Sequence, residues 1–158
     1  MKIFYIASSI IPSRSANSVH VMKMVNAYSL LGHDVTLIVP KQRNKEESNV
    51  FDIFDYYGVK KFKIVYFPWL KFPGSKYLYS FMLSLWIYIN MPNLVYSRDF
   101  YPAVHTSFLR IPTIMEFHGP PKLGSHFYKF YIKKFYLSEH TNFVVISNTL
   151  KNIFKSYK

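Results

Sequence analysis

Six short apolar runs, separated by segments with a helical pattern, constrain this sequence more than any other feature. The runs are rich in β-branched and aromatic residues, and their hydrophobicity is nearly continuous instead of alternating with polar residues. Such continuity is typical of a parallel strand that is covered on both faces. We expect a strand in each run, that is, over residues 3–7, 35–39, 63–67, 94–97, 113–117 and 143–146.

The intervening segments carry helical patterns. In the clearest one, apolar residues recur at helical spacing and form one face: Val21, Met24, Val25, Tyr28 and Leu31. Ser18 is expected to cap this helix and Gly32 to end it. Further helices are predicted over residues 46–57, 75–90, 102–109 and 125–138, and from 147 towards 158. The alternation predicts an α/β fold, a doubly wound, Rossmann-like parallel sheet of about six strands with helices on both faces.

The length and composition limit the classes of protein that remain. We expect a single domain over residues 1–158, because this length buries one real core but not comfortably two. The lack of cysteine excludes disulfides, thiolate metal sites and cysteine nucleophiles. The apolar stretch at 77–91 is shorter than the roughly 20 residues of a spanning helix, and residues 3–7 are too short for a signal peptide. A cytoplasmic location is therefore expected.

The formal charge of +12 allows several partners. It suits nucleic acid, an anionic membrane surface or phosphorylated ligands, and a lysine-rich composition also follows from an AT-biased genome. We expect no nucleic-acid partner. The helix at 125–138 carries His126, Lys129 and Lys133 along one side, with Lys134 nearby. This face suits peripheral contact with an anionic membrane, and it equally suits a solvated basic face over packed aromatic residues.

The loop after the first strand is the first candidate binding segment. Ligands of open parallel sheets bind beyond the carboxyl ends of the strands, and here Arg14, Asn17 and Ser18 lead into a helix. The first-turn amides of a helix can hold a phosphate or a sugar hydroxyl, although an ordinary capped turn has the same pattern. The loop lacks the three spaced glycines of a dinucleotide site, so no nicotinamide or flavin cofactor is expected.

Polar residues also follow the later strands. His118 precedes a Gly-Pro-Pro turn and can serve a sugar hydroxyl or a leaving phosphate, or it can be an ordinary loop histidine satisfied by its neighbours. Arg98 can bind a ligand or form a structural ion pair with Asp99 or Glu116. Ser147 can line a cleft or cap the last helix. The histidines are scattered, so no metal site is expected.

The opening segment, MKIFYIASSIIPSRSANSVHVMKMVNAYSLLGHDVTLIVP, resembles the N-terminal domain of family 4 retaining glycosyltransferases of the GT-B fold. Three later segments follow in the expected order: NLVYSRDFYPA, IPTIMEFHGPP and NFVVISNTLKNIF. The resemblance covers essentially the whole chain and makes it one half of a GT-B fold. It implies transfer of a sugar from a nucleotide-sugar donor, with no further cofactor, to a sugar or lipid-linked acceptor in bacterial cell-envelope polysaccharide synthesis at the inner membrane face.

In that family the N-terminal domain mainly binds the acceptor. By position, His118 matches a histidine near the reaction centre, Asn17 and Ser18 match the acceptor-side loop, and Arg98 and Ser147 match the interdomain cleft. Arg14, Glu116 and Gly119 join this acceptor and cleft set because they follow the same strand ends. The usual glycine pair of the first loop is replaced by SRSANS.

The resemblance also implies a second domain that binds the nucleotide and carries two glutamates. We expect the chain to be truncated or half of a split enzyme, with a donor-binding domain or subunit as its partner. A non-catalytic binding module with the same fold is the alternative. Apolar surface left by a missing partner domain makes a homodimer a further expectation.

Overall fold

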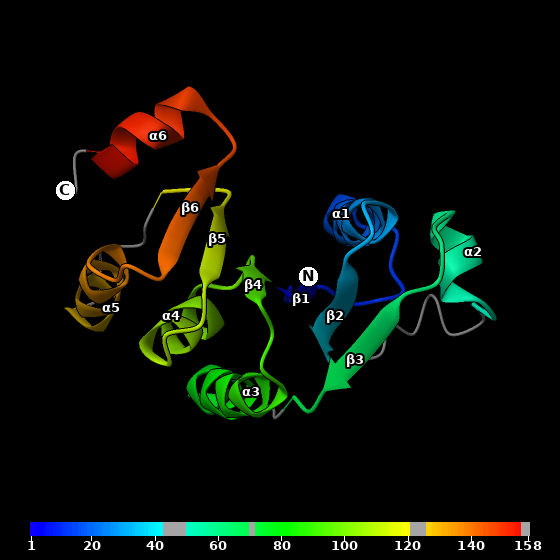
Figure 1. Ribbon diagram of the computed structural model, residues 1–158, viewed down its shortest axis with the longest axis horizontal. Coiled ribbons are helices and arrows are strands. Elements are labelled where there is room, and N and C mark those ends of the chain that lie inside the picture. The colour runs from blue at the N-terminus through cyan, green and yellow to red at the C-terminus, as the bar shows by residue number, and fades with distance from the viewer. Residues whose placement is uncertain (43–49, 70–71, 121–125, 156–158) are drawn as a thin grey trace.

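All six predicted strands form, and they make one parallel sheet. The computed structural model describes residues 1–42, 50–69, 72–120 and 126–155 (Figure 1). The strands are β1 (Lys2–Ile6), β2 (Asp34–Pro40), β3 (Lys63–Phe67), β4 (Leu94–Ser97), β5 (Thr113–Phe117) and β6 (Thr141–Val145). Each adjacent pair is parallel, as continuous apolar strands require.

The strand order is β3-β2-β1-β4-β5-β6. The chain therefore winds outward from β1 to β3, returns to the other side of β1, and winds outward again from β4 to β6. The direction of winding reverses between β1 and β4, and ligands of open α/β sheets bind beyond the carboxyl ends of the strands at such a point.

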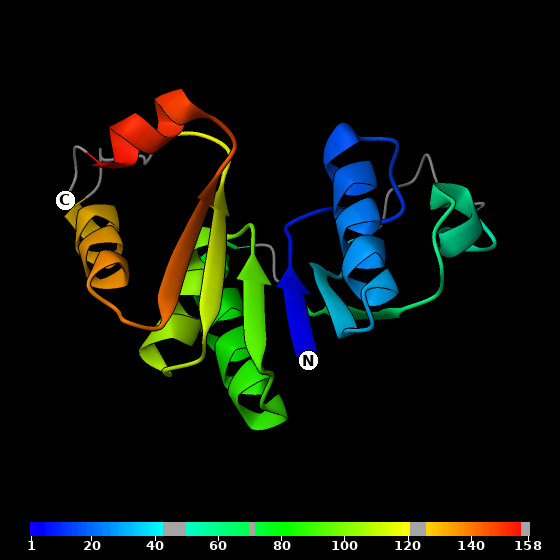
Figure 2. The same ribbon diagram turned by 45° about the horizontal axis from the view of Figure 1, so that its top comes forward.

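Helices cover both faces of the sheet. One layer contains α1 (Ala16–Leu30) and α2 (Ile53–Tyr57), and the other contains α3 (Ser75–Asn90), α4 (Phe100–Phe108) and α5 (His126–Tyr136) (Figures 1 and 2). After β6, α6 (Asn148–Lys155) packs in the same core cluster as α4 and α5, since its Phe154 contacts Phe117 and Phe143. The predicted fold class is confirmed. In the ranges that the structure describes, no helix combines the length and the apolar character needed to cross a membrane.

The start of α1 differs from the prediction. Ser15, not Ser18, is the N-cap, because its side chain accepts a hydrogen bond from the amide of Ser18. Ser18 is buried in the first turn, where its hydroxyl donates to the carbonyl of Ile10. Leu31, predicted on the apolar face, is instead exposed just past the helix end. Gly32 ends the turn as predicted, with a φ of 84°.

The helix predicted at 46–57 begins only at Ile53. Asp52 caps it, since its carboxylate accepts from the amides of Phe54 and Asp55, and these hydrogen bonds lower the pKa of Asp52. Residues 46–49 lie outside the described part of the chain. Gly58 ends the helix in the left-handed region, as predicted. The remaining helices start or end within two residues of the predicted bounds wherever the chain is described.

The pleat of the strands sorts the functional residues onto two faces. On β4 and β5, Tyr96 and Ile114 face α1, whereas Val95 and Met115 pack towards α3, α4 and α5. The same alternation continues past the strand ends. The side chains of Arg98 and His118 therefore point towards α1, and that of Asp99 points towards α3 and α4.

Candidate functional site

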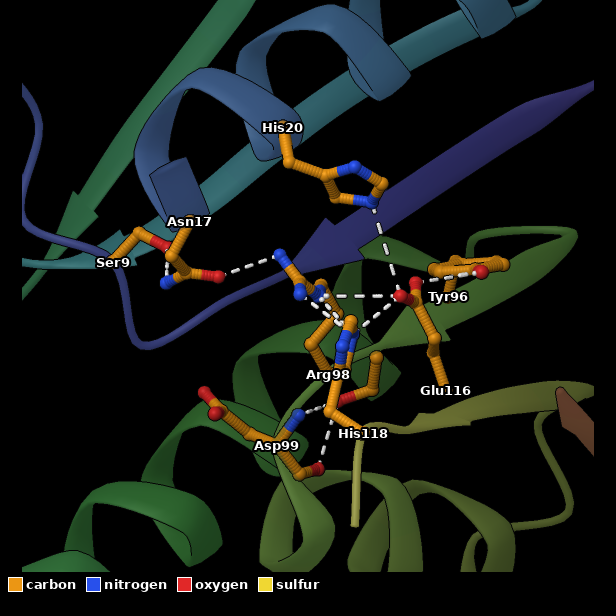
Figure 3. A network of polar contacts seen from close by, with 9 residues as sticks. Ser9, Asn17, His20, Tyr96, Arg98, Asp99, Glu116 and His118 are labelled. Carbon is orange, nitrogen blue, oxygen red and sulfur yellow. Dashed lines mark hydrogen bonds and ion pairs between the residues drawn. The ribbon is translucent and has the colours of Figure 1, made fainter. Parts of the chain in front are cut away.

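Arg98 is the centre of a polar network beyond the carboxyl ends of β1, β4 and β5. Its Nη1 donates to Asn17 Oδ1 at 2.7 Å, and its Nε and Nη2 lie 3.1 and 2.6 Å from His118 Nε2. Its Nε is also 3.6 Å from Glu116 Oε1. These four residues, which we call the Arg98 network, join three separate segments of the chain (Figure 3).

The backbone at Arg98 is fixed before its side chain makes any contact. Its amide donates to the carbonyl of Ile6 at 2.9 Å, which extends the pairing of β4 with β1 by one residue. The buried hydroxyl of Ser97 donates to the carbonyl of Asp99 and accepts from its amide, so the turn after β4 is closed. The guanidinium therefore starts from a rigid position.

Glu116 carries the buried negative charge of the network. Its side chain is 5% exposed, and Oε2 accepts from the hydroxyl of Tyr96 at 2.8 Å. Oε1 contacts Arg98 and His118 and lies 3.8 Å from Nε2 of His20 on α1. Burial, together with this carboxylate, raises the pKa of Tyr96. The buried carboxylate is thus paired with a guanidinium and hydrogen-bonded, as a stable buried charge requires.

His118 shares one ring nitrogen between two partners. Nε2 lies 2.5 Å from Glu116 Oε1 and also within hydrogen-bond distance of two nitrogens of Arg98. With a proton, Nε2 donates to Glu116; without one, it accepts from Arg98. Nδ1 has no hydrogen-bond partner among the described residues, and 42% of the side chain is exposed. One nitrogen is held by the protein while the other faces outward.

Asn17 contributes the α1 side of the network. Its Nδ2 donates to Ser9 Oγ at 2.7 Å while its Oδ1 accepts from Arg98, so both ends of the amide are oriented. Ser18 packs beneath it and holds the loop rather than facing the crevice.

The other predicted site residues lie elsewhere. Arg14 is exposed on the β1–α1 loop, and Gly119 is half-buried directly after His118. Ser147 caps α6, since its Oγ accepts from the amide of Leu150 at 3.2 Å. It also lines a surface groove of about 680 Å³ along β6 and α6. The predicted capping role is therefore present. No contact within the described residues joins Ser147 to the Arg98 network.

Sequence reasoning missed His20, Tyr96 and Ser9. A usable signal existed for two of them: Tyr96 is two residues before Arg98 and so shares its face, and His20 lies one helical turn after Asn17. Of the two ion pairs considered for Arg98, the one with Glu116 is present. Asp99 instead accepts from the hydroxyl of Ser8 at 2.6 Å.

The remaining chemistry of the described residues is limited. No group of three metal-ligating side chains is present in the ranges described. On α5, the side chains of Lys129, Lys133 and Lys134 are exposed, while Ile132 and Phe135 are buried, so a basic face does cover an aromatic core.

Comparison with known sequences agrees with the fold. The sequence pattern of the domain described as Glycosyltransferase Family 4 matches residues 18–158. The search of curated proteins gives no match. The matched range includes the sheet from β2 onward. It also includes Arg98, Glu116 and His118 of the Arg98 network, whereas Asn17 lies one residue before its start. Because the match spans nearly the whole chain, the chain belongs to Glycosyltransferase Family 4.

Proposed function

We propose that this domain binds the acceptor of a retaining sugar transfer from a nucleotide-sugar donor. The observation that carries the proposal is the Arg98 network, a fixed set of polar groups at the point where open α/β sheets bind ligands. Its exposed members are His118 and Asn17, and Arg98 and Glu116 behind them are almost fully buried. Such a layered arrangement is what holds a reacting hydroxyl group in one orientation.

The roles proposed within the network follow from exposure. His118 is the residue that meets the acceptor, because Nδ1 is directed away from the protein partners and 42% of the side chain is exposed. Arg98, with a side chain that is 10% exposed, is a positioning residue that links His118 to Asn17. Glu116 balances the guanidinium charge and, with Arg98, holds Nε2 of His118 in place.

The acceptor is proposed to be a sugar or a lipid-linked saccharide of the bacterial cell envelope. The exposed lysines of α5 support peripheral contact with an anionic membrane, since each lysine near such a surface contributes about 1 kcal/mol. The nucleotide donor is proposed to bind to a second domain or subunit, which closes on the carboxyl edge of this sheet.

The proposal predicts little or no sugar transfer by the 158-residue chain alone. Transfer requires the donor to be held against the acceptor, and positioning of this kind accounts for about 7 to 11 kcal/mol of barrier lowering in favourable cases. The assay incubates the purified chain with radiolabelled uridine-, guanosine- and adenosine-diphosphate sugars and a bacterial lipid extract, with and without a donor-binding domain. Restoration of transfer by that domain supports the proposal. Rapid transfer by the chain alone would contradict it.

A further inference from the structure

A second pocket lies at the same carboxyl edge but on the other face of the sheet. It has a volume of about 310 Å³, within the range of small-molecule sites, and lies between the first turns of α3 and α4. Trp69, Tyr79 and Tyr101 supply aromatic surface, and Ser8, Lys76 and Asp99 supply polar groups. None of these residues belongs to the Arg98 network, and the carboxylate of Asp99 is directed away from Arg98 and His118 in Figure 3. We call this cavity the Tyr79 pocket.

The hydroxyl of Tyr79 is buried without a hydrogen-bond partner among the described residues. The residue is 5% exposed, and its ring is fixed by edge contacts with Phe67 and Trp69, whose centroids are 5.6 and 4.9 Å away. An unpaired buried hydroxyl destabilises a fold, so such groups usually have a ligand or water partner. Burial raises the pKa of this hydroxyl, which therefore stays neutral and can both donate and accept.

Asp99 also retains hydrogen-bonding capacity at the pocket. It occupies the N-cap position of α4, yet its carboxylate makes no capping hydrogen bond and is bonded to Ser8 instead. The hydroxyl and the amide of Ser8 are two donors for a carboxylate that can accept about four. Burial raises the pKa of Asp99 despite these hydrogen bonds. Burial of this carboxylate therefore destabilises its charged form, and the hydrogen bonds from Ser8 offset only part of that free energy.

These groups select one class of ligand. An anion is disfavoured by the Asp99 carboxylate, and Lys76, the nearby cation, is exposed and lies over the rings of Tyr77 and Tyr101. A purely apolar ligand would leave the Tyr79 hydroxyl unpaired and the carboxylate desolvated. A neutral polyhydroxyl ring satisfies both, because its hydroxyls pair with Tyr79 and Asp99 while its C–H face packs on an aromatic ring.

We propose that the Tyr79 pocket is a binding site for a sugar ring, stacked on Trp69 and hydrogen-bonded to the hydroxyl of Tyr79 and the carboxylate of Asp99. The identification of this ring as a sugar unit of the acceptor rests on the proposed function. The binding itself does not, because no member of the Arg98 network takes part.

Trp69 makes the pocket observable. The chain has two tryptophans, so the protein labelled with 5-fluorotryptophan gives one ¹⁹F signal for Trp69 and one for Trp86, which stacks on Phe4 in the core. A Trp86→Phe variant assigns the two signals. Titration with the methyl glycosides of glucose, galactose, mannose and N-acetylglucosamine at millimolar concentrations is expected to shift the Trp69 signal for at least one sugar and to leave Trp86 unchanged.

Tyr79→Phe separates binding from folding. Loss of one hydrogen bond is expected to weaken the binding of that sugar about five-fold, while the unfolding midpoint in urea stays equal or rises because the hydroxyl has no partner in the free protein. Tyr56→Phe is the matched control: its hydroxyl is also buried and unpartnered among the described residues, but it lies on α2, on the opposite face. This variant is expected to bind as the unmodified chain does.

Four outcomes decide the inference. A Trp69 signal that none of the four sugars shifts overturns it, and so does equal binding by the Tyr79→Phe and Tyr56→Phe variants. Sugar binding that is weakened by Tyr79→Phe supports it even if no transfer is found in any assembly, in which case the proposed function fails alone. Transfer that depends on Arg98 but is indifferent to Tyr79→Phe, with no sugar at Trp69, leaves the proposed function standing and removes the pocket.

Discussion

Replacing Glu116 with alanine is expected to lower the free energy of unfolding by about 3 kcal/mol, because removal of one member of a buried ion pair leaves the other charge uncompensated. Arg98 keeps Asn17 and His118 as partners, but its positive charge loses the only carboxylate that contacts it among the described residues. The hydroxyl of Tyr96 loses its acceptor at the same time. Urea unfolding at neutral pH measures the change.

Glu139→Ala is the control for this measurement. Glu139 is an exposed carboxylate before β6, and its removal is expected to change the free energy of unfolding by less than about 0.5 kcal/mol. Glu116→Gln keeps a hydrogen-bond acceptor for Tyr96 and should fall between the two. A Glu116→Ala variant as stable as Glu139→Ala would contradict the claim that Glu116 is the buried counter-charge of the network.

If the proposed function holds, replacing Arg98 with alanine is expected to lower kcat for sugar transfer about 100-fold in an assembly of this chain with the proposed donor-binding domain. Arg98 is the link between His118 and Asn17, and small displacements of a positioned group have effects of this size. Because the side chain is nearly buried, the effect should appear mainly in kcat and less in KM. Steady-state transfer rates over a range of acceptor concentrations separate the two.

Arg98→Lys tests whether charge alone is sufficient. A lysine has one nitrogen in place of the planar guanidinium, so it cannot reach Asn17, Glu116 and His118 together, and we expect it to recover only a minor part of the lost rate. Lys60→Ala, at an exposed site after α2, should leave the rate unchanged. An Arg98→Ala variant with the same kcat as the unmodified enzyme would show that Arg98 does not position His118.

The fold was largely predictable because its signals are local. Continuous apolar runs such as 113–117 carry their strand assignment in their own residues, and glycines such as Gly32 and Gly58 mark helix ends by their backbone freedom. The N-cap of α1 had no such local signal: Ser18 was expected, and Ser15 is the cap. Ser18 is drawn into the first turn because its hydroxyl reaches the carbonyl of Ile10, a contact that depends on the path of the loop.

The candidate site was predictable only as a set of positions. The rule that ligands bind beyond strand ends selected Asn17, Arg98, Glu116 and His118, and these four do lie in contact. Their contacts were not predictable, because the register of β4 with β5, which brings Glu116 beside Arg98, has no local sequence signal. The Tyr79 pocket gave no sequence signal, since Tyr79 occupies an ordinary apolar position of a helix and Asp99 an ordinary cap.

The most direct test of the central claim is a chemical-shift comparison on the ¹⁵N-labelled chain. The claim is that the carboxyl edge at the Arg98 network binds the acceptor and not the nucleotide. Addition of the methyl glycosides is therefore expected to shift the backbone amide signals of Asn17, Arg98 and Gly119, whereas uridine, guanosine and adenosine diphosphates should leave them in place. Shifts of these three amides with a nucleotide, and none with any glycoside, would contradict the account.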